Sequence, residues 1–263
     1  MLIELARDNR SCVAQLFSGY PYLHGSIAAI IAGGMGKVFA DSGAAPQVAL
    51  AVLDFHFLAG DPGHAHAVLL VPSLRPGIVM ITPTPAWQRW LAASYPSELA
   101  LYHREAFQVG AFDSALLHRL AQSLPADFEL SQIGLADVPQ LVADLHAALV
   151  YNFPSHEAFI RTSIGLGILH QGRFVAAASA AAIGGGKAEF EIQTHPQFRR
   201  RGLARAVCAA LMLACLERGL EPCWDAANPP SSALARQLGF RSTGTYDAYV
   251  LRPPAGASTT DAA

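Results

Sequence analysis

The stretch 189–240 constrains the fold of this chain more than any other part of the sequence. A predicted strand over 188–194 leads through a run of arginines to Gly202, and a long apolar helix follows through Leu216. A helix that begins directly after a glycine turn presents free backbone N–H groups and the positive end of its dipole. Gly202 has no side chain, so the backbone there can approach a ligand closely. This order of parts favours a site for a phosphate or a pyrophosphate.

Four arginines add positive charge at this turn. Arg199, Arg200 and Arg201 precede the glycine, and Arg205 follows it in the first turn of the helix. Guanidinium groups bind phosphate oxygens well, although arginines at a helix start are more often simply solvated. The stretch contains neither the Walker lysine motif nor the dinucleotide pattern GxGxxG. A nucleotide cofactor of either of those types is therefore not expected.

A second block follows the long helix. Residues 222–226 have the composition of a strand, and Asn228 and Pro229 are typical of a helix N-cap and the first helical position. That helix is expected to end at Leu238-Gly239-Phe240, where a glycine stop is followed by an apolar residue. The two blocks together give a specific order: strand, basic glycine turn, long helix, strand, asparagine cap and short helix.

These blocks resemble the GNAT superfamily of acetyl-CoA-dependent N-acyltransferases. The similarity is to the signature (Arg/Gln)-x-x-Gly-x-(Gly/Ala), present here as Arg199-x-x-Gly202-x-Ala204, and to an asparagine-to-Leu-Gly-Phe block at 228–240. The resemblance implies an α/β fold in which the C-terminal half forms a GNAT-like mixed central sheet with flanking helices.

Finer details of the sequence resemble one branch of that superfamily. Glu-Ile-Gln-Thr at 191–194 and Trp-Asp-Ala-Ala-Asn at 224–228 are similar to the branch that includes zwittermicin-type antibiotic-resistance acetyltransferases. A looser likeness reaches upstream to Phe128, whereas the N-terminal half resembles the branch only faintly, through 39–41 and 58–60.

The resemblance also implies how the acyl donor binds. Two adjacent parallel strands, 188–194 and 222–226, would splay apart and admit the pantetheine arm of CoA, whose amides would pair with exposed backbone. The amides of 200–204 would hold the pyrophosphate, and Asn228 would contact the pantetheine or thioester end. The residues so implied for donor binding are Ile192, Thr194, Arg199, Arg200, Arg201, Gly202, Leu203, Ala204, Asn228 and Ser232.

Acetyl transfer to an amine requires a base, because an alkylamine with a pKa of roughly 10 is protonated at neutral pH. Glu191, Glu189 and His195 are the candidates on or beside the central strand. We rank Glu191 first as the catalytic residue, because a carboxylate in mid-strand among apolar neighbours is costly unless it opens into a cleft or is paired. A structural hydrogen-bonding role for Glu191 is an equal alternative, and His195 is more typical of a turn residue.

The acid that protonates the departing thiolate is not assigned. Many GNAT enzymes carry a tyrosine seven residues after the asparagine, and that position here is Ala235. A thiolate with a pKa of about 8.5 leaves acceptably without strong acid help. Water could serve, as could one of the nearby hydroxyl groups, which belong to Ser231, Ser232, Tyr246 and Tyr249.

The chain is expected to contain two α/β domains. The boundary is placed at 124–127, which gives a smaller N-terminal domain over 1–125 and a GNAT-like acetyl-CoA-binding catalytic domain over 126–252. The N-terminal domain is expected to close over the acceptor or to mediate homodimerisation, and a degenerate second copy of the same fold is a further alternative. The tail 253–263 is expected to be disordered.

Apolar runs bounded by turn residues locate the expected elements. In the N-terminal half they are strands over 48–58, 65–71 and 77–81 and helices from Pro85 and over 114–123. In the C-terminal half they are strands over 128–133, 165–170 and 173–182 and helices over 137–149 and 155–162.

Composition excludes several classes of function. The net charge of −2 does not indicate a nucleic-acid-binding protein, because such proteins usually have a strongly basic domain. The first ten residues lack the apolar core of a signal peptide, and the longest apolar runs are shorter than the ~18 residues of a membrane span, so we expect a cytoplasmic protein. The four cysteines form no CxxC pair and are expected to be reduced. His56, His64 and His66 are expected to be scattered histidines, without a bound metal.

Three hypotheses for the function remain at this point. The first is an enzyme that transfers an acetyl group from acetyl-CoA directly to a small-molecule amine, in a ternary complex. The second is an acyl-CoA-binding sensor or inactive regulatory module that keeps the donor site, which the alanine at position 235 leaves open. The third is a structural protein whose arginine turn binds no cofactor. Turnover, or a thermal shift with acetyl-CoA, would separate them.

Overall fold

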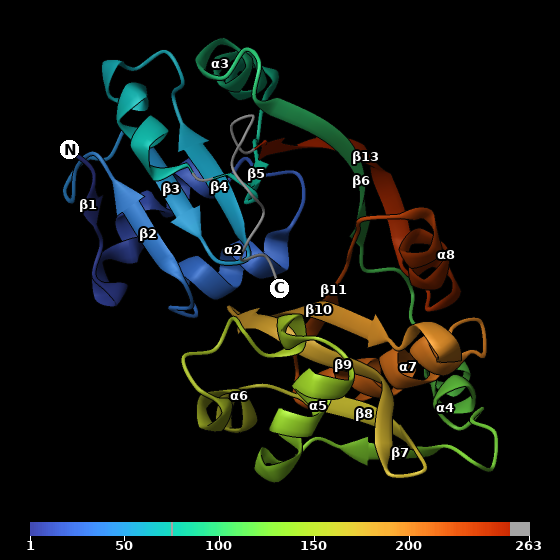
Figure 1. Cartoon of the computed structure of the whole chain (residues 1–263). Coiled ribbons are helices and arrows are strands. Elements are labelled where there is room, and N and C mark those ends of the chain that lie inside the picture. Colours follow the sequence, from blue (N-terminus) through green and yellow to red (C-terminus); the bar gives the residue numbers. More distant parts are fainter. Residues whose placement is uncertain (75, 253–263) are drawn as a thin grey trace. The chain divides into compact units, whose positions relative to one another are not determined.

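The computed structural model describes residues 1–74 and 76–252, and these form two compact units (Figure 1). Among the described residues, the first unit contains 1–21, 36–104 and 246–252. The second unit contains residues 22–35 and 105–245. The predicted tail 253–263 lies outside the described residues.

These units differ from the division at 125–126 expected from the sequence. Residues 22–35 and 105–125 join the C-terminal half, because the helix α2 (His24–Ile31) packs on strands β9 (Arg173–Gly184) and β10 (Lys187–Thr194). The helix α4 (Ser114–Ala121) likewise packs on α7 (Leu203–Glu217). Each unit is therefore built from segments that are distant in the sequence.

The first unit is built on a mostly antiparallel sheet. Its strands follow the order β1 (Ile3–Glu4), β2 (Lys37–Ala40), β3 (Val48–Val52), β4 (Phe55–Gly60), β5 (Val79–Ile81) and β13 (Arg241–Leu251), and only β4 and β5 are parallel. The strand β6 (Leu99–Gln108) comes next in the order, and β6 and β13 both extend into residues of the second unit.

Short helices complete this unit: η1 (Arg7–Val13), α1 (Ala14–Phe17), η2 (Ala65–Ser73) and α3 (Pro85–Ser94). Trp87 and Leu91 of α3 are fully buried in the core, and the Trp87 indole N–H donates to the carbonyl oxygen of Gly60 at 2.9 Å. Thr84 caps α3 through a bond from the Trp87 amide. The predicted helix from Pro85 and the predicted strand over 77–81 are both confirmed.

Two predictions in this unit are wrong. The apolar run 65–71 is the 3-10 helix η2 and not a strand. After the turn at 61–63, the Ala67 amide donates a hydrogen bond to the His64 carbonyl oxygen, three residues earlier, and this bond starts the helix. The run 48–58 is a hairpin and not one strand, since the chain reverses at Leu53 and Asp54 without glycine or proline.

The second unit is built on a five-stranded sheet with the order β11 (Glu221–Cys223), β10, β9, β8 (Gly165–His170) and β7 (Glu129–Gln132). All neighbours are antiparallel except β10 and β11, which are parallel. Alternate residues of β9 serve two cores: Ala176 and Ala178 pack with α7, whereas Ala177 packs with α5 (Val138–Asp144). Helices therefore cover both faces of this sheet.

The predicted strands 128–133, 165–170, 173–182 and 188–194 and the predicted helices 114–123 and 155–162 are confirmed, the last as α6 (His156–Thr162) with Ser155 as its cap. The predicted helix over 137–149 is instead three pieces: η3 (Leu135–Asp137), α5 and η4 (Ala147–Leu149). The break comes at His146, whose Nδ1 atom accepts a hydrogen bond from the Ala148 amide at 3.0 Å and starts η4 separately.

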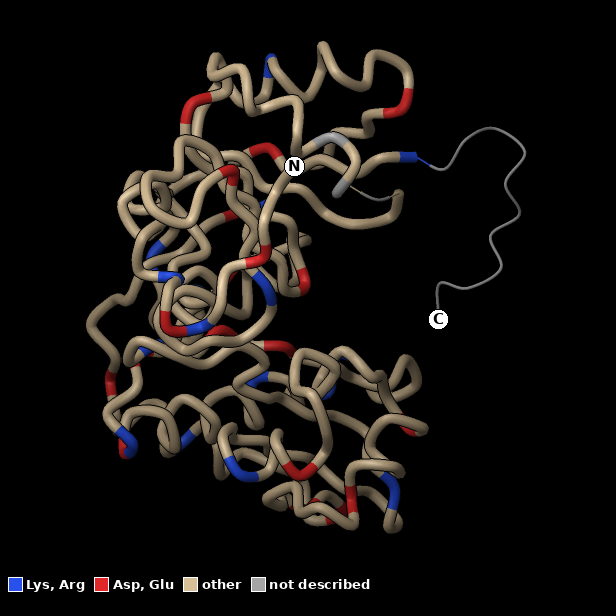
Figure 2. The backbone as a smooth tube through the Cα atoms, turned by 90° about the vertical axis from the view of Figure 1, so that its left-hand side faces the viewer, with Lys and Arg blue, Asp and Glu red and all other residues tan. Residues whose placement is uncertain are grey.

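Both charge signs occur along the backbone of each unit (Figure 2). All four cysteines are free, and Cys208 and Cys215 are fully buried in the core around α7. Burial raises the pKa of the Cys215 thiol to about 12. In the part of the chain that the structure describes, no helix combines the length and the apolarity that crossing a membrane requires.

Candidate functional site

The parallel strands β10 and β11 stay together for only a short distance. Their pairing runs from Lys187 opposite Glu221 to Glu189 opposite Cys223. The chain then turns at Trp224 into the short strand β12 (Asp225–Ala226), which pairs with β6 instead of β10. Over 190–194, the described strand pairings of β10 are with β9, along one edge. The other edge offers N–H and C=O groups to a ligand, so the expected divergence of the two strands is confirmed.

The start of α7 lies beyond the end of β10, after the 3-10 turn η5 (Pro196–Phe198). Gly202 is the N-cap, with φ 81° and ψ 0°, and Arg200 also has a positive φ of 66°. No side chain caps this helix. Within the described residues, the amides of Leu203, Ala204 and Arg205 donate to no protein acceptor. Successive free amides next to left-handed residues form a concave anion site.

The arginines of this turn form no salt bridge with Asp or Glu in the described residues. Arg199, Arg200 and Arg201 are exposed. The Arg199 Nε atom donates to the Thr194 carbonyl oxygen at 3.3 Å. The Arg201 guanidinium lies 5.1 Å from the centre of the Phe198 ring. The Nε atom of Arg205 is buried without a hydrogen-bond partner. A ligand with negative charge would satisfy these groups.

The space around Gly202 is open. A β-carbon built there would meet only the terminal nitrogen of Arg205, at 3.6 Å, which is an ordinary contact. The conformation of the residue, and not crowding by protein, is therefore what requires glycine at this position. The residues present thus fit a diphosphate held by amides and guanidinium groups.

Asn228 begins α8 (Pro229–Gln237) close in sequence to β12. Its Oδ1 atom accepts a hydrogen bond from the Ser231 amide at 3.0 Å, which confirms the predicted cap. Trp224 donates from its indole nitrogen to the Ser231 hydroxyl oxygen at 3.1 Å. The side chain of Asn228 is exposed, so its amide nitrogen is accessible while the oxygen caps the helix.

Ser232 is buried and bonds to the carboxylate of Glu105, a residue of β6. Hydrogen bonds from Ser232 and Ser242, together with the charge of Arg236, outweigh burial and lower the pKa of the Glu105 carboxyl group. Ser232 therefore connects α8 to β6, and its predicted contact with the donor stays a prediction.

The two glutamates of β10 share one face. Phe190 points into the core around α7, so Glu189 and Glu191 point to the opposite side of the sheet. Glu189 is 8% exposed, and its Oε2 atom lies so close to α2 that a β-carbon on Gly25 would be 2.7 Å from it. Glu191 is half-buried and accepts a hydrogen bond from Gln193 Nε2 at 2.6 Å.

A cavity of about 60 Å³ lies beside Glu189. Its walls include His24 at the start of α2, Phe107 of β6, and Cys223 and Trp224 at the point where β11 ends. Burial, with the nearby charge of Glu189, raises the pKa of the Cys223 thiol, so it is protonated at neutral pH. Sequence reasoning missed the contributions of α2 and β6, because 99–108 shows no regular alternation of apolar and polar residues and α2 has no side-chain cap.

The structure also places the candidate acids. Ala235 is fully buried in α8 and packs in the core around α7. Tyr249 is buried in the core of the first unit, and Tyr246 is the first residue of that unit's C-terminal segment. His195 is half-buried at the end of β10, and its Nδ1 atom has no partner in the described residues.

Comparison with known proteins gives consistent results. A family model described as GNAT acetyltransferase matches residues 16–249. The uncharacterized N-acetyltransferase YdfB of Bacillus subtilis is 26% identical over 229 residues, which are 81% of this chain and 85% of that protein. The crystal structure of a GCN5-related N-acetyltransferase-like protein from Streptococcus suis superposes with a TM-score of 0.83 and 33% identity, covering 93% of this chain and 99% of that one. A tandem GNAT protein from the clavulanic acid pathway, 15% identical, has the same fold with a TM-score of 0.55, covering 95% of this chain and 96% of that one.

Proposed function

This chain belongs to the GNAT acetyltransferase family and is an acyltransferase, and from that premise we propose that it transfers an acetyl group from acetyl-CoA to a small-molecule amine in a ternary complex. One observation carries the proposal: β10 and β11 separate after Glu189 and Cys223, and α7, which follows β10 after the turn η5, begins with uncapped amides. Members of this family use acetyl-CoA as the donor, which supplies the acetyl thioester that the amine attacks.

Each part of the donor has a matching group on this chain. The open edge of β10 at Ile192 and Thr194 would pair with the amides of the pantetheine arm. The amides of 200–204 and the guanidinium groups of Arg199, Arg200 and Arg201 would hold the pyrophosphate. The exposed amide nitrogen of Asn228 would contact the thioester end.

Glu191 is the residue we propose as general base. It lies on β10 beyond the point of divergence, on the face opposite to α7, and it is half-buried. Glu189 is packed against Gly25 and is almost fully buried, so a proton taken up there has a less direct route to solvent. Gln193 holds one carboxylate oxygen of Glu191 at 2.6 Å, which orients the other.

The departing thiolate would be protonated by water in this proposal. Ala235 supplies no proton and the Ser232 hydroxyl already donates to Glu105, whereas the Ser231 hydroxyl oxygen accepts from Trp224 and keeps its own hydrogen as the alternative to water. Because a thiol of pKa about 8.5 is an acceptable leaving group, this arrangement costs little rate. The choice of a small-molecule acceptor rests on the resemblance of 191–194 and 224–228 to antibiotic-resistance acetyltransferases.

The test begins with calorimetric titration of acetyl-CoA, followed by measurement of CoA release with a panel of polyamines, amino sugars and aminoglycosides. Binding together with CoA release and an acetylated amine is the expected result. Intersecting initial-velocity patterns, without acetylated protein in the mass spectrum, would show direct transfer. Binding without release across the panel would favour the acyl-CoA sensor, which the buried Ala235 keeps as the second candidate.

The variant Glu191→Gln tests the base. Loss of general-base catalysis lowers kcat by about 10²- to 10⁴-fold, while the dissociation constant for acetyl-CoA stays within about twofold because the donor-binding groups are intact. Glu129→Gln, an exposed glutamate of β7, is the matched control. A purely structural role for Glu191 would instead lower stability and leave the pH profile of kcat unchanged.

A further inference from the structure

Two strand ends meet at one edge of the sheet in the first unit. β2 and β4 both pair antiparallel with β3, so they run in the same direction and finish at the same edge. Asp41 follows β2 directly, and the turn at 61–63 follows β4. Residues that are far apart in the sequence are thereby placed side by side.

Asp41 is firmly positioned at this edge. Its side chain is 2% exposed, and its Oδ1 atom accepts hydrogen bonds from the amides of Gln47 at 2.9 Å and Val48 at 3.2 Å. The Oδ2 atom points the other way and lies 2.7 Å from the Nδ1 atom of His66. One carboxylate oxygen therefore stabilises the backbone of the following loop, and the other faces an imidazole.

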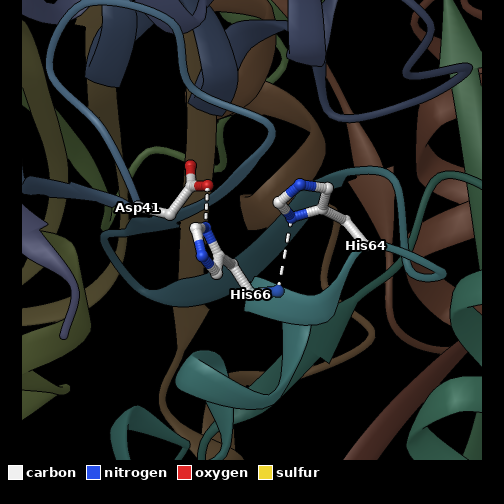
Figure 3. A group of neighbouring side chains, drawn as sticks. All are labelled: Asp41, His64 and His66. Atoms are coloured by element: carbon white, nitrogen blue, oxygen red, sulfur yellow. Dashed lines mark hydrogen bonds and ion pairs between the residues drawn. The ribbon is translucent and has the colours of Figure 1, made fainter.

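One short segment supplies two imidazoles beside this carboxylate: His66 faces it, and the His64 ring lies next to His66 (Figure 3). Asp61 holds the turn through a bond from the Gly63 amide at 2.8 Å, and the His64 amide donates to the Asp61 carbonyl oxygen. The His64 and His66 rings then lie 4.8 Å apart at 82°, and the His66 amide donates to His64 Nδ1 at 3.3 Å. The His66 side chain is 53% exposed, so the group is open to solvent.

We propose that Asp41, His64 and His66 form a binding site for a divalent transition-metal ion, with Zn²⁺ as the ion that fits best. One ligand atom from each residue lies within 4.8 Å of the other two. Two imidazoles and one carboxylate are a common three-ligand set for Zn²⁺, with a fourth position left to water or another ligand. Oxygen-preferring ions such as Mg²⁺ do not suit imidazole ligands.

Only a small movement is needed to close the site. Two atoms that are each about 2.0–2.1 Å from Zn²⁺ lie roughly 3.4 Å apart in a tetrahedral sphere. The Asp41–His66 pair is already closer than this, and the ion would replace the hydrogen that now lies between them. His64, on a half-buried turn, must rotate toward the pair.

His56 lies in β4 and is not part of the group. The proposal departs from the sequence-based expectation because Asp41, which follows β2, is distant in the sequence from the two histidines.

The test is equilibrium dialysis of the full, tag-free chain, stripped with a chelator, against Zn²⁺ and separately against Mg²⁺. The expected result is one equivalent of Zn²⁺, no Mg²⁺, and a melting temperature that rises with free Zn²⁺ because an ion bound to the native state stabilises it. The double variant His64→Gln/His66→Gln should bind Zn²⁺ at least about tenfold more weakly. Both side chains lie on a surface turn, so the variant is expected to fold.

His103→Gln is the matched control, because His103 also pairs with a carboxylate, Asp247, at 2.9 Å, but is not in the group. It should bind Zn²⁺ as the unchanged protein does. Asp41→Asn keeps an oxygen for the Gln47 and Val48 amides and should still weaken binding. Absence of bound Zn²⁺ at micromolar free ion, or equal binding by the double variant, would overturn the proposal. Titration with acetyl-CoA should be unchanged in the double variant, so this outcome is independent of the proposed activity.

Discussion

The helices α7 and α8 begin in opposite ways, although both follow strands of the second unit. At α8, Asn228 has extended backbone angles, φ −159° and ψ 161°, and its side chain accepts from the Ser231 amide. At α7, Gly202 has a left-handed conformation and no side chain caps the helix. Side-chain capping requires an extended N-cap, so the backbone of Gly202 is itself incompatible with the usual cap. The chain satisfies the amides of α8 internally and leaves those of α7 for a ligand.

The variant Gly202→Asp should have the largest effect on this contrast. It places a negative charge where the diphosphate would lie, and we expect acetyl-CoA to bind about 100-fold more weakly or worse. The free energy of unfolding should fall by no more than about 1 kcal/mol, since the surrounding space is open and only the positive φ is unfavourable. Titration calorimetry and urea unfolding measure the two effects. Gly202→Asn, which tolerates this conformation without charge, should weaken binding less; equal losses in both would exclude the electrostatic explanation.

Arg200→Gln should have the next largest effect. Removal of one charge-assisted hydrogen bond is worth about 1.5–3 kcal/mol, or roughly tenfold or more in affinity for acetyl-CoA. The dependence of affinity on salt concentration should become shallower, because one fewer positive group attracts the donor. Arg89→Gln, an exposed arginine of α3, should change neither quantity. A salt dependence identical to that of the unchanged protein would contradict a role for Arg200 in binding phosphate.

Asn228→Ala tests the capped member of the pair. Loss of the cap should lower the free energy of unfolding by about 1 kcal/mol, measured by urea denaturation. Asn228→Asp keeps an oxygen for the Ser231 amide and should restore stability, but it lacks the amide nitrogen proposed to contact the donor. We therefore expect weaker acetyl-CoA binding in both variants. Full recovery of binding by the aspartate would limit Asn228 to capping.

The smallest effect is expected from Glu105→Gln, which loosens the attachment of α8 to β6. The pKa of Glu105 is lower in the folded protein, so its contribution to stability is present above the ordinary carboxyl pKa and is lost as pH falls through the lowered value. At neutral pH the variant should be less stable by about 0.5 kcal/mol. The difference should vanish in acid. A difference that persists at low pH would assign the effect to packing.

Local chemistry made α7 and α8 predictable from the sequence. Gly202 after the arginines and Asn228 before Pro229 are start signals that act within a few residues, and the structure has both helices where they were expected. The divergence of β10 and β11 followed from the family resemblance and is present. The roles of the individual donor-binding residues and of Glu191 stay predictions.

Elements that depend on distant contacts could not be predicted. The N-cap of α2 is Leu23, in a left-handed conformation and without a side-chain cap, so the sequence carries no start signal for that helix. Its position depends on the close approach of Gly33 to Gly184, two glycines from different parts of the chain. The apolar run 65–71 has the composition of a strand as well as of a short buried helix, and periodicity alone does not separate them.

The placement of α2 also affects the order in which the protein can assemble during synthesis. The ribosome makes α2 early, but its contacts on β9 and β10 exist only after most of the chain has emerged. Until then the apolar side of α2 lacks those contacts, and the core of the first unit still lacks Tyr249 and Leu251 of β13. A fragment that begins after residue 104 would leave the surface under α2 uncovered. Expression of residues 105–252 alone should therefore give an aggregating product, and co-expression with a peptide covering 22–35 should restore a soluble one.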